Sequence, residues 1–389
     1  MNLKMAKHEE VSDALIRDGE IADALKSFGS GFATDVADLI GQKTEADLYS
    51  AVVSSQFDAD RLDYMRRDRL MTGTQHGGID FEWLLSNLEV GRVSAGVDDE
   101  PLEPVSTFVL GPKAIFAAES YIQGLFQLYP TVYYHKATRG AEKLCSELLI
   151  QVFLRQTDGS HALTGLPKAH PLLEFAKRSK DLEAVLALDD TVVLGSLEFL
   201  SNSKDSCIAY LANCLKRRHL YKCIDVREEL QKRIALKDDP TQLEASCSRA
   251  FTQFIDDGFG CMGDAALQNA VRMTIKDKLD LDRLDRACLY VNEQLKTPLG
   301  ISSEPPSIIM DQATRRPYKR VQETKGPLEQ IHIRSADTGE LLDVATVSRV
   351  VAAVRDFKLL RAYVRRDDRE SQRKVMQSIE EGATHALAA

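Results

Sequence analysis

The sequence predicts a mainly α-helical protein with a small α+β region at its C-terminal end, and three observations support this. Apolar residues recur at three- and four-residue spacing in nearly every segment from Val11 to about Leu295, which is the period of helices with one buried face. Aromatic residues make up only 7% of the chain, with a single tryptophan, Trp83, so aliphatic side chains must build the core. After Thr297 the pattern changes to short strand-like runs.

The helical part divides into successive helices at polar or glycine-containing stretches. Candidate loops fall at 91–103, 157–171 and 201–205. Prolines are scarce between these loops, and no internal repeat with a period of about 20–50 residues is present. Helical spacing is clearest for Leu182, Val185, Leu186, Leu197 and Leu200, and for Ile208, Leu211 and Leu215.

The C-terminal region combines strand, turn and helix signals. A proline pair precedes the apolar run Ser307–Met310, and apolar residues alternate with polar ones over Glu329–Arg334. A turn signal follows at Asp337–Gly339. These signals predict a small sheet or hairpin, then a closing helix over about 348–363. The charged and alanine-rich tail over 365–389 has a weaker tendency to hold a fixed position.

Composition excludes several classes of protein. With 389 residues, 44% hydrophobic and 28% charged, the chain is globular and long enough for two or three domains. Its net charge of −9 repels polyanions overall, so nucleic-acid binding would need a local basic patch. Without a run of about 18 apolar residues or a leader segment, we expect no membrane association and a cytoplasmic location. Seven cysteines without a C-x-x-C pair predict reduced core thiols.

The most informative stretch is S-S-Q-F-D-A-D-R-L-D-Y-M-R-R-D-R-L-M-T-G, residues 54–73. On a helix, Asp60, Tyr64 and Asp68 would share one face, with Arg61 beside them. That face would combine metal-type ligands with a phosphate-type donor. The alternative is an exposed helix of weak charge pairs, such as Asp63 with Arg67.

This stretch resembles the last motif of HD-domain phosphohydrolases of the deoxynucleoside triphosphate triphosphohydrolase type, the dGTPase-like family that includes the mammalian SAM-and-HD-domain hydrolase. In that family the motif supplies the final aspartate of a metal site, which falls here on Asp60. It also supplies groups that contact phosphate or sugar, which fall on Arg61, Tyr64 and Asp68. The resemblance therefore implies a helical HD-domain-type bundle, incomplete at its N-terminus.

Three further segments follow in the order that the family has. The segment Y-P-T-V-Y-Y-H-K, residues 129–136, resembles the V-Y-x-H helix, whose first tyrosine lies beside the substrate and is here Tyr133. Tyr129 in the same segment is a further substrate-binding candidate. Leu188–Asp190 resembles the L-D-D segment, and residues 211–222, which end in R-R-H-L-Y-K, resemble the R-x-L-[FY]-K segment.

The resemblance also implies a divalent metal ion, Mg, Mn or Fe, which polarises a phosphoryl oxygen or activates a bound water. The family's early His and its His-Asp pair are absent, because none of the eight histidines precedes an Asp. His8-Glu9 matches the His-Glu pair that follows them in the family, so His8 is the candidate acid/base group. The chain is thus expected to begin inside the catalytic domain. Asp60 alone cannot hold a catalytic ion, and we expect the chain by itself to be inactive.

Two positions depart from the family pattern within the matching segments. Leu125 stands where members of the family commonly carry an Arg directed at the phosphates. Pro130 removes a helical N–H and is expected to kink the helix unless the helix begins there. Both departures predict an altered nucleotide pocket.

Other motifs give weaker signals. Gly258–Gly263 fits G-x-G-x-x-G but follows no convincing strand, so a loop is the better explanation. Basic clusters at 216–219, 315–320 and 361–366 would suit phosphates of an effector nucleotide or single-stranded nucleic acid, and exposed helix ends are the alternative. His76 is expected to be a turn residue.

These observations favour one function and leave others open. The first is a metal-dependent hydrolase of dNTPs that yields deoxynucleoside and triphosphate, with deoxynucleotides as ligands and a homo-oligomeric assembly. The alternative is a non-catalytic helical module that binds nucleotides or a partner, and a third is weak nucleic-acid contact through the basic clusters. The expected domains are 1–155, the remainder of the HD-type catalytic domain, 156–300, a helical lobe, and 301–389, the α+β region with its tail.

Overall fold

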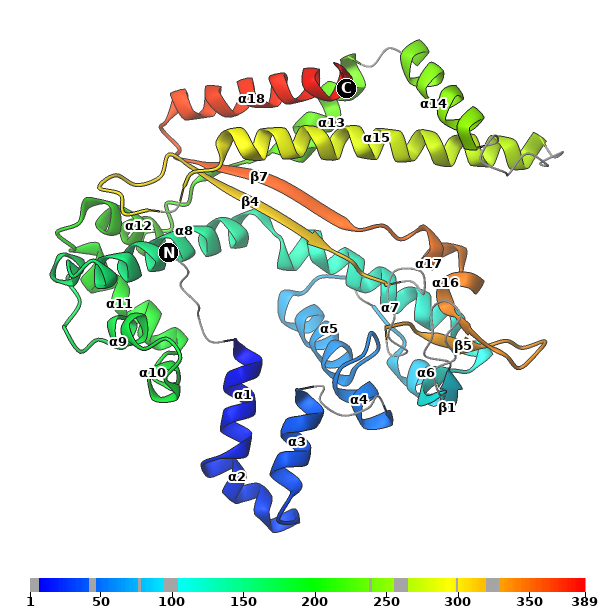
Figure 1. Ribbon diagram of the computed structural model, residues 1–389, viewed down its shortest axis with the longest axis horizontal. Coiled ribbons are helices and arrows are strands. Elements are labelled where there is room, and N and C mark those ends of the chain that lie inside the picture. Colours follow the sequence, from blue (N-terminus) through cyan, green and yellow to red (C-terminus); the bar gives the residue numbers. More distant parts are fainter. Residues whose placement is uncertain are drawn as a thin grey trace. The chain divides into compact units, whose positions relative to one another are not determined.

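The computed structural model describes residues 7–41, 47–75, 78–93, 104–237, 240–254, 265–298, 300–319 and 329–388. Over these residues the chain is mainly α-helical and contains two small sheets (Figure 1). This confirms the predicted fold class in its broad form. None of the helices in the described ranges is long and apolar enough to cross a membrane.

The chain divides into two compact units, and each unit is assembled from three segments. Unit 1 contains Met1–His135, Ala169–Leu194 and Thr314–Phe357, whereas unit 2 contains Lys136–Lys168, Gly195–Ala313 and Lys358–Ala389. Each unit therefore draws on more than one of the three expected domains. The boundaries near residues 155 and 300 stay a prediction.

Unit 1 is built from short helices, many of which begin at an aspartate. Asp47, Asp58 and Asp80 each accept a hydrogen bond from a backbone N–H in the first turn of a helix, which is the usual role of an N-cap. Its helices are α1 (His8–Arg17), α2 (Glu20–Leu25), α3 (Phe32–Ile40), α4 (Leu48–Val53), α5 (Ala59–Thr72), α6 (Phe81–Ser86), α7 (Ile115–Leu128), α9 (Pro171–Lys177), α10 (Leu182–Leu186), α16 (Val344–Val347) and α17 (Arg349–Ala353), with the π-helical turn η3 (Tyr129–Tyr133) after α7.

A four-stranded sheet with the order β1-β2-β5-β6 belongs to unit 1. Strands β1 (Leu88–Val93) and β2 (Val105–Leu110) are antiparallel, and β5 (His332–Arg334) runs parallel to β2 and antiparallel to β6 (Leu341–Asp343). The predicted hairpin is confirmed by β5 and β6, which are joined by a turn where Gly339 takes φ +73°. Glycine adopts this left-handed conformation without steric cost.

The core of unit 1 lies between this sheet, α5 and α7. Its buried side chains include Met65, Leu84, Leu110, Tyr121, Ile122, Leu125, Leu128, Ile331, Ile333 and Val344. Burial of a large aliphatic side chain contributes about 1.5–3 kcal/mol. This core therefore fixes one face of α5 and leaves other faces of the helix available to ligands.

Unit 2 contains the longer helices and a three-stranded sheet with the order β3-β7-β4. The sheet joins β3 (Lys222–Asp225), β7 (Phe357–Val364) and β4 (Ile308–Arg315), with β3 and β7 antiparallel. Its helices are α8 (Lys136–Thr157), α12 (Ser206–Lys216), α13 (Val226–Lys237), α14 (Pro240–Phe254), α15 (Ala265–Leu295) and α18 (Arg369–Ala388), while α11 (Asp190–Ser201) contributes to both units.

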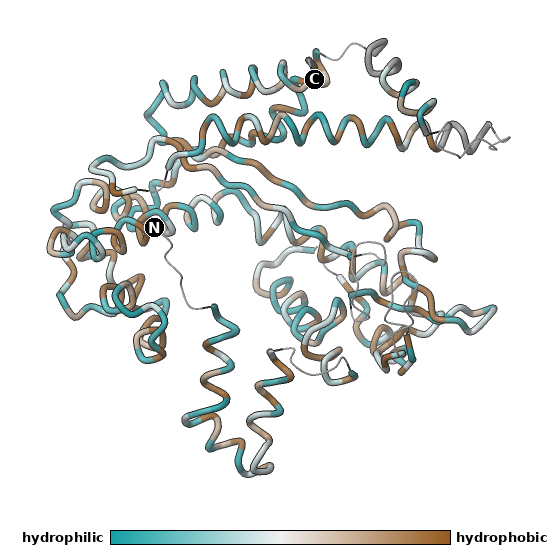
Figure 2. The backbone as a smooth tube through the Cα atoms, viewed as in Figure 1, coloured by the Kyte–Doolittle hydropathy of each residue, from teal (hydrophilic) through white to brown (hydrophobic). Residues whose placement is uncertain are grey.

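The helices α15 and α18 pack against each other along the core of unit 2, and Figure 1 shows them running side by side. Hydrophobic and hydrophilic residues alternate along both helices (Figure 2). On α18, the buried Val375, Ile379, Ala383 and Ala386 follow helical spacing. Gly382 lies so close to α15 that an added Cβ would be 2.7 Å from Val291 Cγ2.

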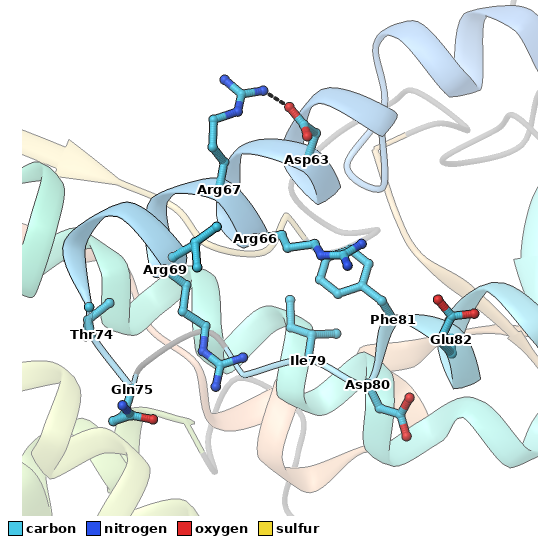
Figure 3. Close-up of a pocket in the computed structure, with 12 residues that line it drawn as sticks. Asp63, Arg66, Arg67, Arg69, Thr74, Gln75, Ile79, Asp80, Phe81 and Glu82 are labelled. Carbon is cyan, nitrogen blue, oxygen red and sulfur yellow. Dashed lines mark ion pairs between the residues drawn. The ribbon is translucent and has the colours of Figure 1, made fainter.

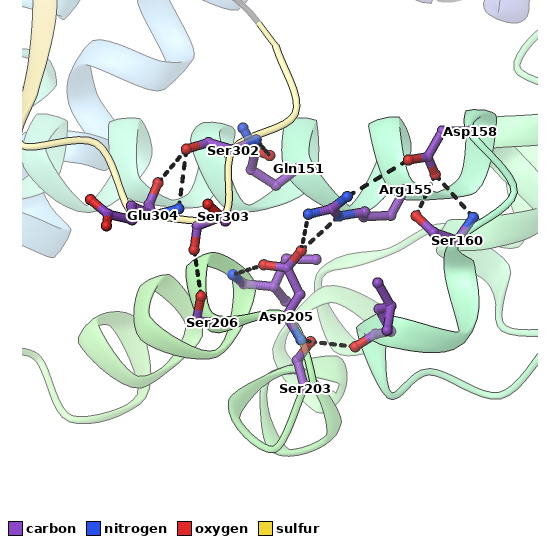
Figure 4. A network of polar contacts seen from close by, with 12 residues as sticks. Gln151, Arg155, Asp158, Ser160, Ser203, Asp205, Ser206, Ser302, Ser303 and Glu304 are labelled. Atoms are coloured by element: carbon purple, nitrogen blue, oxygen red, sulfur yellow. Dashed lines mark hydrogen bonds and ion pairs between the residues drawn. The ribbon is translucent and has the colours of Figure 1, made fainter.

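Buried ion pairs hold other parts of unit 2 together. Arg155 on α8 donates from Nε to Asp205 Oδ2 at 2.6 Å, and Asp205 also caps α12 by accepting from the Ile208 N–H at 3.1 Å (Figure 4). Asp311 on β4 is fully buried and accepts from Arg139 Nε at 3.1 Å. Because both aspartates are paired, their burial is compatible with a stable fold.

Several expectations for the order of elements were wrong. Residues 91–93, expected in a loop, belong to β1; the rest of that loop lies outside the described residues. The closing helix over 348–363 is instead the short α17 followed by β7. Strand β7 is buried on both faces, so it lacks the alternation that marks a half-exposed strand.

The tail forms α18, which packs against α15. The predicted breaks at 157–171 and 201–205 are confirmed.

Candidate functional site

The candidate site is built on α5, whose two ends are both capped. Asp58 accepts a hydrogen bond from the Arg61 N–H at 2.7 Å, and its carboxylate lies 3.3 Å from Arg61 Nε. At the other end Gly73, with φ +68°, donates its N–H to the Arg69 carbonyl at 3.1 Å. These are the ordinary start and stop signals of a helix, and they fix which residues share a face.

Tyr64 and Asp68 lie on the face of α5 that meets the π-helical turn η3. The Tyr133 hydroxyl donates to Asp68 Oδ2 at 2.7 Å. The Tyr133 ring packs edge-on against Tyr64, with centroids 6.1 Å apart, and lies 6.2 Å from the Tyr129 ring. The structure therefore brings together four residues of the two matching segments.

Pro130 explains how the tyrosines reach this face. Proline lacks the N–H that would continue the α-helical ladder, and the chain forms a π-helical turn in which the Tyr134 N–H donates to the Tyr129 carbonyl at 2.7 Å. Such single π turns rotate side chains away from α-helical positions. The predicted kink at Pro130 thus takes the form of η3.

Burial raises the pKa of the site tyrosines, which are protonated at neutral pH even at the ordinary tyrosine pKa of about 10. It raises the pKa of Tyr64 to about 12, an effect that the positive charge of Arg61 opposes. Burial also raises the pKa of Tyr129, again opposed by Arg61, and burial together with the hydrogen bond to Asp68 raises the pKa of Tyr133. At neutral pH the phenols are therefore hydrogen-bond donors, and Arg61 supplies positive charge beside them.

The predicted metal ligand and acid/base group are both exposed, and Asp60 lies one helical turn from Tyr64, where its charge raises the pKa of that phenol. Asp60 is exposed in the first turn of α5. His8 begins α1, where its side chain is 87% exposed and its Nδ1 lies 3.1 Å from Glu9 Oε2. In the ranges that the structure describes, no three His, Cys, Asp or Glu side chains are grouped as metal ligands. Asp60 alone does not fit a divalent ion, and we derive no chemical step through one.

Leu125, at the position of the family's arginine, is 1% exposed and belongs to the core of unit 1. A buried leucine at this place offers no charge to a phosphate group. The remaining cations near the tyrosines are therefore the ones that matter for anion binding, and Arg61 is the first of them.

A cavity of about 880 Å³ lies along the face of α5 that carries Arg66 and Arg67 (Figure 3). Arg66 stacks over the Phe81 ring at 5.7 Å, and Arg67 pairs with Asp63. Three arginines and three acids line this cavity, namely Arg66, Arg67, Arg69, Asp63, Asp80 and Glu82. No sequence motif predicted this cavity, and its one signal in the sequence is the run of arginines on the face of α5 away from Tyr64.

Two of the basic clusters meet in unit 2. Arg217 and His219 from one cluster and Arg366 from the other line a cavity of about 440 Å³ beside Tyr210. In the third cluster Arg316 pairs with Asp356, and residue 320 lies outside the described residues. His76 and the glycine motif at 258–263 also fall outside them.

No protein-family model matches the chain. The uncharacterized protein YwfO of Bacillus subtilis is 27% identical over 219 residues, 56% of this chain and 47% of its own length. The uncharacterized protein MJ1154 of Methanocaldococcus jannaschii is 24% identical over 227 residues, 56% of this chain and 41% of its own length. The chain thus spans less than half the length of these curated relatives.

Two solved structures are similar along most of the chain. A phosphohydrolase from Bacteroides thetaiotaomicron superposes with a TM-score of 0.57 and 20% identity, over 93% of this chain and 73% of that protein. A hypothetical protein from Aquifex aeolicus superposes with a TM-score of 0.54 and 18% identity, over 96% of this chain and 72% of that protein. At such identities the similarity establishes the fold, and this chain has a phosphohydrolase-like fold.

Proposed function

We propose that this chain carries the nucleotide-binding wall of an HD-type phosphohydrolase that converts a dNTP to deoxynucleoside and triphosphate. The observation that carries the proposal is the hydrogen bond from Tyr133 to Asp68, because it joins the two segments that resemble the family's substrate motifs. The phosphohydrolase-like fold supports the reaction class.

In this proposal each side chain has a role suited to its chemistry. Arg61 contacts the phosphates, since a guanidinium presents several donors in a planar fork that matches phosphate oxygens. Tyr64 and Tyr133 bind the sugar through phenols that stay protonated at neutral pH, with Asp68 orienting Tyr133, while Tyr129 forms the adjoining wall. The proposal includes no role for a metal ion, because Asp60 alone does not fit one, and His8 as the acid/base group stays a prediction.

A second candidate is a nucleotide-binding module without turnover. It is favoured because the contacts that hold the site depend only on this chain: Tyr133 with Asp68, and Arg61 with Asp58. Both candidates share the binding site. They differ in whether triphosphate is released, which ³¹P NMR detects after incubation with Mg²⁺ or Mn²⁺.

Titration calorimetry of the full chain with each of the four dNTPs tests the shared claim. We expect Arg61→Gln to weaken dNTP binding by about tenfold, since a hydrogen bond to a charged group contributes about 1.5–3 kcal/mol. Tyr133→Phe keeps the ring and removes the hydroxyl, and should weaken binding about fivefold, which corresponds to about 1 kcal/mol.

Tyr49→Phe is the matched control, because Tyr49 is 73% exposed and should leave affinity unchanged. A deoxynucleoside, which lacks phosphates, should bind equally to the wild type and to Arg61→Gln. If no dNTP binds to the folded wild-type chain, or if the two site variants bind like the wild type, the proposal is wrong.

A further inference from the structure

A second guanidinium lies near the tyrosines, contributed by β4. The Arg315 Cζ atom stands 5.6 Å from the centroid of the Tyr134 ring, within the range of a cation–π contact. Tyr134 in turn packs at 6.3 Å from Tyr129 and at 5.4 Å from Phe357. Arg315 at the end of β4 and Phe357 at the start of β7 fall in unit 1 together with the tyrosines, whereas most of both strands belongs to unit 2.

Aromatic rings connect this guanidinium to the α5 face. Tyr129 is the middle of the row, because its ring lies 6.2 Å from Tyr133 on one side and 6.3 Å from Tyr134 on the other. The charges of Arg61 and Arg315 both lower the pKa of Tyr129 against the stronger effect of burial. The guanidinium groups of Arg61 and Arg315, which are far apart in the sequence, therefore both lie close enough to the Tyr129 phenol to interact with it electrostatically.

Arg315 differs from its neighbours in how its charge is balanced. Arg61 lies against Asp58, and Arg316 against Asp356 with Nε–Oδ1 at 3.1 Å and Nη2–Oδ2 at 3.4 Å. Arg315 is exposed and donates from Nη1 to the Thr314 carbonyl at 3.2 Å. Within the described residues no carboxylate pairs with it, so its charge is available to an anion.

We propose that Arg315 is a second phosphate-binding residue of the site and that Arg61 and Arg315 bind different phosphate groups of one polyphosphate chain. The inference rests on the proposed function and deepens it, since it assigns the substrate class to triphosphates rather than monophosphates. Arginine is suited to this task because it stacks on an aromatic ring while its remaining N–H groups bind phosphate oxygens.

The test compares neighbouring arginines on the full chain by titration calorimetry with dATP, dAMP and inorganic tripolyphosphate. Arg315→Gln should weaken binding of dATP and tripolyphosphate by about tenfold, and that of dAMP by less than about twofold. Arg316→Gln is the matched control, because Asp356 already neutralises that guanidinium, and it should bind like the wild type. Arg315→Lys keeps the charge but loses the planar guanidinium that stacks on Tyr134, so it should recover only part of the affinity.

The outcomes separate this inference from the proposed function. If dATP binds and depends on Arg61 but is unaffected by Arg315→Gln, the role of Arg315 is refuted and the proposed function stands. If tripolyphosphate binding depends on Arg315 while no dNTP binds, the phosphate site stands and the dNTP function is refuted. Equal losses in Arg315→Gln and Arg316→Gln would also overturn the inference, because they would reflect general surface charge.

Discussion

The proposed site depends on the contact between Tyr133 and Asp68. Tyr133 supplies the hydroxyl donor, and Asp68 supplies the carboxylate acceptor. The Asp68 carboxylate accepts a hydrogen bond from the Tyr133 phenol, so the ring is held in one orientation. A tyrosine held in this way can recognise a sugar without first losing conformational freedom. Arg61 is held in the same way. The Asp58 carboxylate accepts a hydrogen bond from the backbone N–H of Arg61 and forms an ion pair with the Arg61 guanidinium.

His332 gives a pH prediction at the residue scale. This side chain is 9% exposed, and its Nδ1 lacks a hydrogen-bond partner within the described residues. Burial lowers the pKa of His332, and the nearby Asp343 carboxylate opposes that effect. The unfolded chain, with an ordinary histidine pKa of about 6.5, therefore binds a proton that the folded chain resists. This contribution to stability is present above about pH 6.5 and is lost as the pH falls.

We expect the free energy of unfolding to drop between about pH 7 and about pH 5 in the wild type, and to drop less in His332→Leu. Urea unfolding followed by circular dichroism measures both values. His8→Gln is the control, because the His8 side chain is 87% exposed and its removal should leave the wild-type pH dependence in place. Identical pH dependence in wild type and His332→Leu would contradict the prediction.

At the scale of elements, helical spacing and capping signals predicted most of the helices, whereas burial on both faces concealed strands. The break at 201–205 is explained by Asp205, which caps α12. Strand β7 has the pattern F-K-L-L-R-A-Y-V, whose apolar residues fit a helix as well as a strand, and only its pairing with β3 decides the outcome. Pairing between segments so far apart is not visible in local sequence.

Part of the candidate site was likewise predictable from local spacing, and part was not. The spacing of Tyr64 and Asp68 on one helix was sufficient to place them on a shared face, and the structure confirms this arrangement. The approach of Arg315 could not be predicted, because it depends on where β4 ends relative to η3. The grouping of Asp60 with His8 in one catalytic site stays a prediction.

The close contact of α18 with α15 gives a prediction about packing. Gly382→Ala places a Cβ at 2.7 Å from Val291 Cγ2 and 3.3 Å from the Ala287 carbonyl. Overpacking of this kind costs about 1–3 kcal/mol, which exceeds the gain of about 1 kcal/mol from replacing glycine by alanine in a helix. We therefore expect Gly382→Ala to destabilise unit 2.

Gly195→Ala is the matched control for this change. Gly195 is exposed within α11, and no atom lies within 4 Å of an added Cβ, so this variant should gain about 0.5–1 kcal/mol. Thermal unfolding of the two variants should shift the melting temperature in opposite directions. Equal shifts would mean that α18 does not pack against α15 as described.

At the scale of the whole molecule, the two units have separate cores and different candidate ligand sites. Unit 1 carries the tyrosines, Arg61 and Arg315, whereas unit 2 carries the basic cavity beside Tyr210. The phosphohydrolase-like fold spans both units, since the Bacteroides phosphohydrolase matches 93% of the chain. The proposed nucleotide-binding site therefore lies in one unit of a fold that is larger than the site itself.

Hydrogen–deuterium exchange with and without dATP tests that assignment most directly, because it locates the ligand on the chain. We predict slower amide exchange on dATP binding in α5 (Ala59–Thr72) and across residues 129–136, with little change in α12 (Ser206–Lys216). Slower exchange confined to unit 2, or dATP binding without any change in α5 and residues 129–136, would contradict the central claim.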